Sequence, residues 1–180
     1  MAKLIVNPTS SNRREIPLAR TTILTIGRDP SNDLVLPDSM VSRRHAVIEY
    51  RAGQFLTFRI PHADGVFNRC YSLSSAPETD GLPKVTIKRV AGGKGSNWFH
   101  DSVKEGGTLD VLPPAGRFVL GEGDAPLLLF GGGSGITPMM ALIKSALKQG
   151  KRQIRLFYAN RDKQSVIFDA EFEALLAAHS

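Results

Sequence analysis

The chain has 180 residues, of which 42% are hydrophobic and 22% charged, as in an ordinary globular protein with one large domain or two small ones. No apolar run approaches the roughly 20 residues that cross a bilayer, and the N-terminus lacks the apolar core of a signal peptide, so we expect a cytoplasmic protein. The single cysteine, Cys70, excludes an intramolecular disulfide and any site built from cysteines alone, while the net charge of +6 favours anionic partners.

Short β-rich runs separated by turn residues make up the first 50 residues, which predicts a sandwich or barrel of strands. The runs are residues 3–6, 22–26, 33–36 and 45–48. Arg28 ends one run, and Ser42 and Arg43 precede another. Guanidinium groups and a hydroxyl at strand ends suit a phosphate, because arginine forms bidentate charge-assisted bonds. The alternative is that Arg28 and Arg43 are solvated loop residues and His45 is a packing residue.

These strings resemble the forkhead-associated (FHA) domain, a β-sandwich that binds phosphothreonine. The matching strings are Ile26-Gly27-Arg28, Asn32–Leu36 and Val41–Ile48, followed by Gly53-Gln54-Phe55. By this resemblance Arg28, Ser42 and Arg43 would contact the phosphate of a phosphothreonine peptide, and His45 would be structural. The match covers about residues 1–50, the first half of such a domain. Asp64 stands where the family has the asparagine that holds the peptide backbone.

Residues 51–122 alternate in a way that predicts a small antiparallel barrel with one short helix. The strand-like runs are residues 55–60, 69–77, 84–90, 108–112 and 116–120, and Ser96 is the expected N-cap of the helix. Alternate residues of a strand point the same way, so Arg69 and Tyr71 offer a cation for a diphosphate and an aromatic plane for a ring. The N-terminus of the helix adds N–H groups for a phosphate. Alternatively, Tyr71 belongs to the core and Arg69 to the surface.

A glycine-rich run, Gly131–Gly135, joins a predicted buried strand at 126–130 to a predicted helix. Glycines without side chains let bare N–H groups and the positive end of the helix face an anion. The steric alternative is that a tight strand-to-helix turn needs glycine by itself. In the expected helix, Thr137 is the N-cap, Pro138 the first residue and Gly150 the stop. Its buried stripe is Met139, Leu142, Ile143, Ala146 and Leu147, with Lys144, Lys148 and Gln149 on the other side.

A second strand at 153–159 completes a βαβ unit, and Asn160 and Arg161 follow at its carboxyl end, where open α/β sheets bind ligands. Arg161 is placed to reach a ribose 2′-phosphate or to remain solvated, so the choice between NADH and NADPH stays open. A last helix is expected, with Phe172, Leu175 and Leu176 as its buried stripe.

The chain from about residue 51 to 180 resembles the ferredoxin–NADP reductase superfamily, most closely the reductase components of bacterial aromatic-ring and steroid oxygenases. The strings that carry the resemblance are Arg69-x-Tyr71-Ser72-x-x-Ser75, Gly95-Ser96-Asn97 and Gly131–Met139. The resemblance implies FAD and NADH or NADPH as cofactors, hydride transfer between them, and single electrons passed to an iron–sulfur or ferredoxin-type acceptor. Ser72 would donate a hydrogen bond to the flavin N5, and Ser72 and Thr137 are the implied catalytic positions.

The implied cofactor-binding residues fall into two groups. For FAD they are Arg69, Cys70, Tyr71, Ser72, Lys88, Gly95, Ser96 and Asn97; for the nicotinamide nucleotide they are Gly131, Gly132, Gly133, Ser134, Gly135, Ile136, Thr137, Asn160 and Arg161. No metal site is predicted, and no nucleic-acid motif is visible.

We therefore predict a mixed β and α/β chain in three parts. Residues 1–50 are a partial FHA-like β segment, residues 51–122 an FAD-binding β-barrel without its first strands, and residues 123–180 the N-terminal part of an NAD(P)-binding α/β domain. Strands of the first 50 residues are expected to complete the barrel, and the two nucleotide sites to face each other. The alternative function is a phosphothreonine-binding module with an inactive reductase-like fragment.

Overall fold

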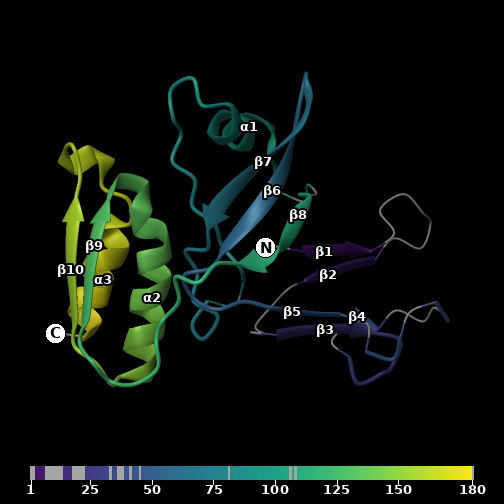
Figure 1. Ribbon diagram of the computed structural model, residues 1–180, viewed down its shortest axis with the longest axis horizontal. Helices are drawn as coiled ribbons and strands as arrows, with labels where there is room; N and C mark the ends of the chain where they lie inside the picture. Colours follow the sequence, from purple (N-terminus) through teal and green to yellow (C-terminus); the bar gives the residue numbers. More distant parts are fainter. Residues whose placement is uncertain are drawn as a thin grey trace.

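The computed structural model describes residues 3–6, 14–17, 23–32, 34–35, 39–40, 42–44, 46–80, 82–105, 107 and 109–179. Their strands form four sheets, two near the N-terminus, one antiparallel in the middle of the chain and one parallel at its end (Figure 1). The predicted mixed β and α/β class is confirmed. None of the helices in the described ranges has the length and apolar composition of a membrane span.

The N-terminal strands lie together on one side of the molecule, opposite the C-terminal helices (Figure 1). Here β1 (Lys3–Val6) pairs antiparallel with β2 (Arg14–Pro17), and β3 (Ile23–Gly27) lies between β4 (Leu34–Val35) and β5 (Ala46–Glu49). The four predicted runs are strands; β2, of which Arg14 and Glu15 are the first two residues, was not predicted. His45 lies outside the described residues. Within the described part, no strand of the first 50 residues pairs with the middle sheet, so the expectation that they complete the barrel is wrong.

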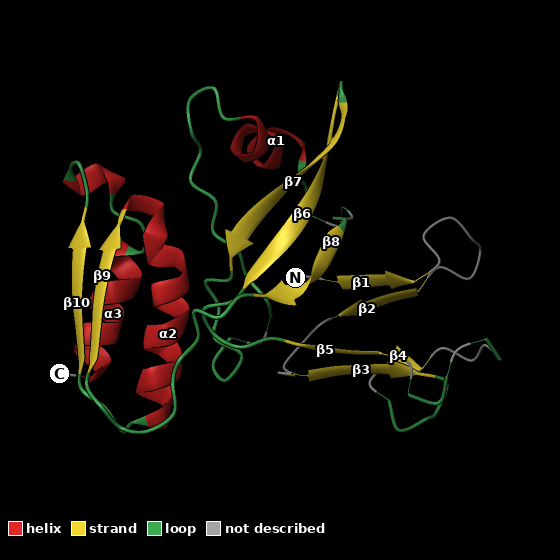
Figure 2. Cartoon of the chain, viewed as in Figure 1, coloured by secondary structure: helices red, strands yellow, loops and turns green. Residues whose placement is uncertain are grey.

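The middle sheet has the order β7-β6-β8, and α1 covers one of its faces (Figure 2). Its strands are β6 (Phe55–His62), β7 (Gly65–Ser72) and β8 (Val111–Ala115), and α1 is Lys94–Ser102. Phe58 of β6 packs edge-on against Phe99 of α1, with ring centroids 5.0 Å apart. Three paired strands are thus described where a small antiparallel barrel without its first strands was expected.

Two strands expected in this part are absent from the described residues. The run at 84–90 contributes only an isolated bridge between Val85 and Leu73. The run at 116–120 is loop, because Gly116 turns the chain at φ +117° after β8. β8 itself contains Pro113 and Pro114, which an edge strand tolerates because it has no partner on one side.

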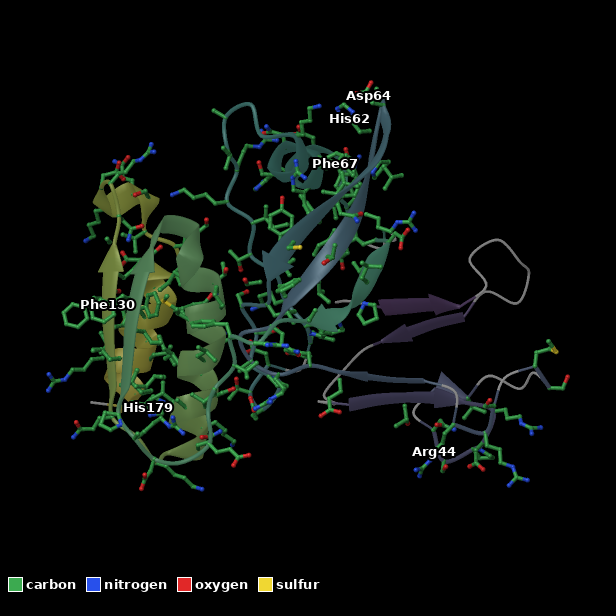
Figure 3. All side chains as sticks on the ribbon, in the orientation of Figure 1. Arg44, His62, Asp64, Phe67, Phe130 and His179 are labelled. Atoms are coloured by element: carbon green, nitrogen blue, oxygen red, sulfur yellow. The ribbon has the colours of Figure 1, made fainter. Side chains whose placement is uncertain are left out.

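The parallel sheet pairs β9 (Leu127–Gly132) with β10 (Ile154–Ala159), joined by α2 (Ile136–Gln149) and followed by α3 (Asp169–His179). Both helices lie on one face of this sheet (Figure 1). Leu129 on that face is 6% exposed, whereas Phe130 on the other is 65% exposed and stacks on Phe157 at 5.0 Å, pointing away from the helices (Figure 3). The prediction of a strand buried on both faces is therefore wrong.

The helix ends differ from the prediction in detail. Gly135, not Thr137, is the N-cap of α2, and Gly93, not Ser96, is the N-cap of α1. Gly150 ends α2 at φ +64°, as predicted. The predicted stripe of α2 is buried at Leu142, Ile143 and Ala146, but Leu176 of α3 is 69% exposed and Lys144 is not on a solvated face. Lys144 is inside because α2 packs against the middle of the chain as well as against its own sheet.

Candidate functional site

Side-chain hydroxyls hydrogen-bond two carbonyls of the glycine-rich turn after β9. A short 3₁₀ turn, η1 (Gly133–Gly135), leads directly into α2. The Tyr158 hydroxyl donates to the Gly133 carbonyl at 2.9 Å, and the Thr137 hydroxyl donates to the Ser134 carbonyl at 3.1 Å. These bonds direct two carbonyls of the turn into the protein. The outer side of the turn, at the N-terminal end of α2, is left to N–H groups.

The steric alternative accounts for only part of this glycine run. A Cβ at Gly131 would lie 2.9 Å from Met139 Sδ, so the methionine side chain would have to shift, and Gly133 has φ +50°, a conformation that favours glycine. A Cβ at Gly135 would meet nothing within 4 Å, and one at Gly132 only the Ala159 carbonyl oxygen at 4.0 Å. The open space beside Gly132 and Gly135 is what a phosphate group would fill.

The motif residues of β7 meet the N-terminus of α1. A Cβ at Gly95 would lie 3.0 Å from the Tyr71 hydroxyl and 3.1 Å from Arg69 Cγ. Tyr71 is half-buried and packs edge-on against Phe58 and Phe99, and this burial raises the pKa of its hydroxyl, opposed by the charge of Arg69. Arg69 is exposed. Tyr71 therefore belongs to the apolar cluster and still borders the predicted anion site.

The side chains at the start of α1 hold the preceding loop. Ser96 Oγ accepts from the Val90 N–H at 3.1 Å, and Asn97 Nδ2 donates to the carbonyls of Val90 and Gly93 at 3.1 and 2.7 Å. No side chain caps this helix and no acidic residue lies in its first turn. Its backbone N–H groups, rather than the side chains of Ser96 and Asn97, are the groups that would face a phosphate.

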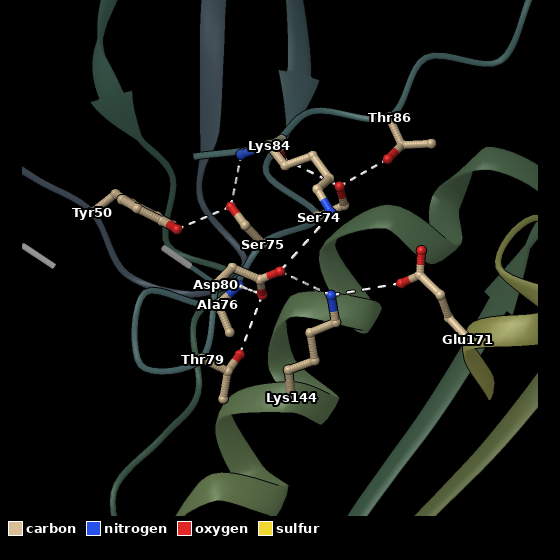
Figure 4. A network of polar contacts seen from close by, with 10 residues as sticks. All are labelled: Tyr50, Ser74, Ser75, Ala76, Thr79, Asp80, Lys84, Thr86, Lys144 and Glu171. Atoms are coloured by element: carbon tan, nitrogen blue, oxygen red, sulfur yellow. Dashed lines mark hydrogen bonds and ion pairs between the residues drawn. The ribbon is translucent and has the colours of Figure 1, made fainter. Parts of the chain in front are cut away.

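The last serine of the β7 motif has a structural role. Ser75 is fully buried, and its Oγ accepts from the Tyr50 hydroxyl at 2.9 Å and from the Lys84 N–H at 2.8 Å (Figure 4). Burial raises the pKa of Tyr50. Ser72 is half-buried at the end of β7, and Cys70 is exposed with its Sγ 3.3 Å from Thr57 Oγ1. Ser72 thus remains a candidate for contact with a cofactor.

A cleft of about 730 Å³ brings residues of the two predicted nucleotide sites together. Its lining is Lys88–Ala91 on one side and Gly133, Ala159–Asp162 and Ser165 on the other. The Lys88 ammonium donates to the Ser165 carbonyl at 3.3 Å, and Arg161 is exposed. Asn160 Oδ1 is buried and has no hydrogen-bond partner among the described residues. A buried acceptor of this kind suits a donor from a ligand, such as a ribose hydroxyl.

Tyr158 is a residue of the candidate site that the sequence analysis did not single out. Its hydroxyl donates to the Gly133 carbonyl and accepts from the Ile167 N–H at 3.2 Å, so it connects the glycine turn to the segment before α3. Its inward position in β10 follows from the alternation of exposed Phe157 and Ala159 around it. The sequence gives little sign of this alternation, because Phe157 and Ala159 on the exposed face are themselves apolar.

Parts of the chain are similar to known families and proteins. Residues 129–180 match the family described as oxidoreductase NAD-binding domain, and residues 24–67 match the FHA domain. The ferredoxin reductase component of the 3-ketosteroid-9-alpha-monooxygenase of Rhodococcus rhodochrous is 57% identical over 127 residues, which cover 70% of this chain and 36% of the relative. The corresponding protein of Mycolicibacterium smegmatis is 49% identical over 133 residues, covering 73% of this chain and 38% of the relative.

Two solved structures agree with these sequence matches. The FAD/NAD-binding domain of nitric oxide dioxygenase from Vibrio cholerae superposes with a TM-score of 0.65 at 29% identity, covering 73% of this chain and 58% of that chain. Phthalate dioxygenase reductase gives 0.62 at 31% identity, covering 69% of this chain and 38% of that chain. About 70% of the chain is therefore similar in sequence to these ferredoxin reductase components and similar in fold to these two solved structures. The chain spans little more than a third of the length of these two curated relatives.

The FHA match overlaps the reductase-like part. Residues 51–67 fall within the FHA match, but in the structure they form β6 and the start of β7, paired in the reductase-like sheet. The residues expected to contact a phosphate precede residue 51, and they lie on two loops that hydrogen bonds join. The Arg28 N–H donates to the Ser42 carbonyl at 3.0 Å, and the buried Asn32 donates from Nδ2 to the Arg43 carbonyl at 2.7 Å. The side chains of Arg28, Ser42 and Arg43 are exposed on these two joined loops.

The structure also places Asp64 away from the loops that carry Arg43 and Arg44 (Figure 3). Asp64, at the position of the family's peptide-holding asparagine, lies at the far tip of the β6–β7 hairpin beside His62, at the opposite end of the molecule from Arg44 (Figure 3). Residues 62–65 are at that tip because β6 and β7 pair from Phe55 and Ser72 out to His62 and Gly65. A ligand at Arg43 would therefore not reach Asp64.

Proposed function

We propose that this chain is the cofactor-binding part of an electron-transfer reductase, which takes a hydride from NADH or NADPH onto FAD and passes electrons singly to an iron–sulfur acceptor. The observation that carries the proposal is the shared cleft, lined by Lys88 from the FAD set and by Gly133, Asn160 and Arg161 from the nicotinamide set. The domain boundaries after residues 50 and 122 and the cytoplasmic location belong to the same proposal.

The residues would hold two dinucleotides by different means. On the FAD side, the exposed guanidinium of Arg69 and the N–H groups at the start of α1 would bind the diphosphate, and Tyr71 would border the ring system. On the nicotinamide side, the open backbone at Gly132 and Gly135 would receive the second diphosphate. When bound, FAD supplies the chemistry that converts a two-electron donor into single electrons.

The remaining polar residues would orient these groups. Asn160 Oδ1 would accept a hydrogen bond from a ribose hydroxyl, because it is buried and lacks a partner within the described chain. Ser72 would donate to the flavin N5. The Thr137 hydroxyl already donates to the Ser134 carbonyl, so its part in catalysis would be to shape the glycine turn. Positioning of this kind contributes most of what a protein adds to cofactor chemistry.

The names of the relatives and the net charge of this chain both support an iron–sulfur protein as the electron acceptor. The Rhodococcus rhodochrous and Mycolicibacterium smegmatis relatives are named ferredoxin reductase components of a monooxygenase. A net charge of +6 suits an acidic redox protein as electron acceptor, since complementary charge speeds the encounter of two proteins.

The test begins with the purified chain and FAD. We expect a perturbed flavin spectrum after desalting, bleached anaerobically by NADH or NADPH. Arg69→Ala should weaken FAD binding, whereas Arg59→Ala, an exposed arginine on the other face of the same sheet, should not. Flavin that passes through the desalting column unbound, with Arg69→Ala indistinguishable from wild type, would refute the proposal.

A second candidate function is phosphothreonine binding at the joined loops. It is supported by the exposed side chains of Arg28, Ser42 and Arg43, which two backbone-anchored loops present together. Titration with a phosphothreonine peptide should then show binding that Arg43→Ala abolishes and Arg59→Ala leaves intact. Equal binding of the unphosphorylated peptide would exclude this function.

A further inference from the structure

A polar network connects α2 to the loop that follows the β7 motif (Figure 4). Lys144 Nζ lies 3.2 Å from Asp80 Oδ1 and 3.6 Å from Glu171 Oε2 of α3. The side chains of Lys144 and Asp80 are only 15% and 16% exposed. Solvent and salt screen the attraction between such buried charges much less than that between surface charges, so this ion pair is stronger than an exposed one.

Asp80 is fixed from its own side of the contact. Its Oδ2 accepts from the Ala76 N–H at 2.9 Å and from the Thr79 hydroxyl at 3.2 Å, and its own N–H donates to the Ala76 carbonyl at 2.8 Å. The carboxylate therefore cannot turn to follow a moving lysine. A displacement of α2 would break the ion pair rather than stretch it.

A second polar contact joins the same two segments. The Ser145 hydroxyl, on a residue that is 1% exposed, donates to Glu78 Oε2 at 2.5 Å. Two adjacent residues of α2 are thus bound to two residues of one loop. Two contacts restrict rotation of the helix against the loop, which a single contact does not.

The network lies between the two parts of the candidate site. The loop 76–80 continues from the β7 motif, whose Ser75 is buried directly before it. Lys144 lies on α2 about two turns after Thr137, so the same rigid helix carries the glycine turn at its N-terminal end. Any rotation of α2 at Lys144 would move the glycine turn relative to Arg69 and Tyr71.

We infer that Lys144 is a positioning residue, which through its ion pair with Asp80 fixes the orientation of the glycine turn relative to β7 and α1. Lys144 is not among the residues that line the cleft between the predicted nucleotide sites. The effect of this ion pair on hydride transfer rests on the proposed function. The reaction needs the two rings in one near-attack geometry, and a misplacement of about 1 Å costs on the order of 100-fold in rate.

The test compares Lys144→Met, which removes the charge and keeps the length, with Lys148→Met, an exposed lysine one turn later on the same helix. We expect Lys144→Met to lower the limiting rate of flavin reduction by roughly 10- to 100-fold, while the Kd for FAD changes less than about twofold. Lys148→Met should behave as wild type, and Lys144→Arg, which keeps the charge, should recover most of the rate. Should Lys144→Met fail to fold, Asp80→Asn tests the same pair.

A distance measurement keeps this inference separate from the proposed function. Nitroxide labels at Ser102→Cys on α1 and Arg155→Cys on β10, in a Cys70→Ser background, report the arrangement of the two parts without any cofactor. We expect one narrow distance distribution that Lys144→Met broadens and Lys148→Met does not. An unchanged distribution in Lys144→Met overturns the inference even if the wild type reduces flavin. A broadened distribution supports it even if the wild type binds no flavin, which would refute only the proposed function.

Discussion

Gly135→Ala separates what the glycine turn does for folding from what it does for a ligand. Gly135 has φ −63° and ψ −9°, a conformation open to any residue, and a Cβ there meets nothing within 4 Å. Alanine at such a position restricts the unfolded chain, which stabilises a protein by about 0.4–1 kcal/mol. Alanine is also a poorer N-cap than glycine, which costs a similar amount. We therefore expect the free energy of unfolding to stay unchanged within about 1 kcal/mol.

The same methyl group should damage nucleotide binding. It would occupy the open space at the N-cap of α2, where we place a diphosphate. Each hydrogen bond lost to a charged group costs about 1.5–3 kcal/mol, which is roughly a 10- to 150-fold increase in Kd. Gly121→Ala, in an exposed loop where a Cβ also meets nothing within 4 Å, is the matched control and should leave the Kd unchanged.

Urea unfolding followed by fluorescence gives the stability of each variant, and titration with NADH and with NADPH gives the two Kd values. The nucleotide with the lower Kd is then the preferred cofactor, which settles the choice between NADH and NADPH. An anion site at Gly135 is refuted if Gly135→Ala binds nucleotide as well as wild type, because the open space then serves no ligand. A role for Gly135 in binding alone is refuted if the variant loses more than about 1 kcal/mol of stability, because glycine would then be a requirement of the fold.

Three further predictions concern stability, each measured by urea unfolding. Leu129→Ala should cost about 2–4 kcal/mol because the side chain is 6% exposed, whereas its neighbour Phe130→Gln, 65% exposed on the open face, should cost less than about 1 kcal/mol. Gly53→Ala should cost more than about 2 kcal/mol, because φ is +92° and the Cβ would lie 2.0 Å from the Phe118 carbonyl oxygen. Burial raises the pKa of the Tyr50 hydroxyl above 10.0, so this hydroxyl loses its proton at a higher pH in the folded state than in the unfolded state. The free energy of unfolding of the wild type should therefore fall as the pH rises above about 10. The fall should be less steep in Tyr50→Phe, which has no hydroxyl at this position.

The sequence predicted those features that depend on a local pattern. The approach of Arg69 and Tyr71 to the start of α1 follows from strand alternation, and the stop at Gly150 follows from its place after an amphipathic run. Helix starts were placed wrongly, because Ser96 and Thr137 are good capping residues on composition but use their hydroxyls inside the first turn. The capping preference of serine and threonine does not show whether such a residue is the N-cap or lies within the first turn.

The features that depend on distant packing were not predictable in this way. Lys144 occupies a position that a helical projection places among polar residues, and only its contact with Asp80, 64 positions earlier in the chain, explains its burial. Phe130 reads as a core residue of a buried strand, yet it is exposed because both helices pack on the opposite face of β9. Local hydrophobicity reports how apolar a strand is, not how many of its faces are covered.

Residues 51–67 match two families, and the pairing of β6 with β7 decides which structure they form. Leu56 lies opposite Tyr71 and Phe58 opposite Arg69, so both motif residues stand on the face that α1 covers. A shift of one residue in this register would turn Arg69 and Tyr71 to the other face. The segment is therefore committed to the reductase-like site, and any phosphopeptide binding must come from the loops around Arg28 and Arg43 alone. The two candidate functions use separate elements, so each can be lost by mutation without the other.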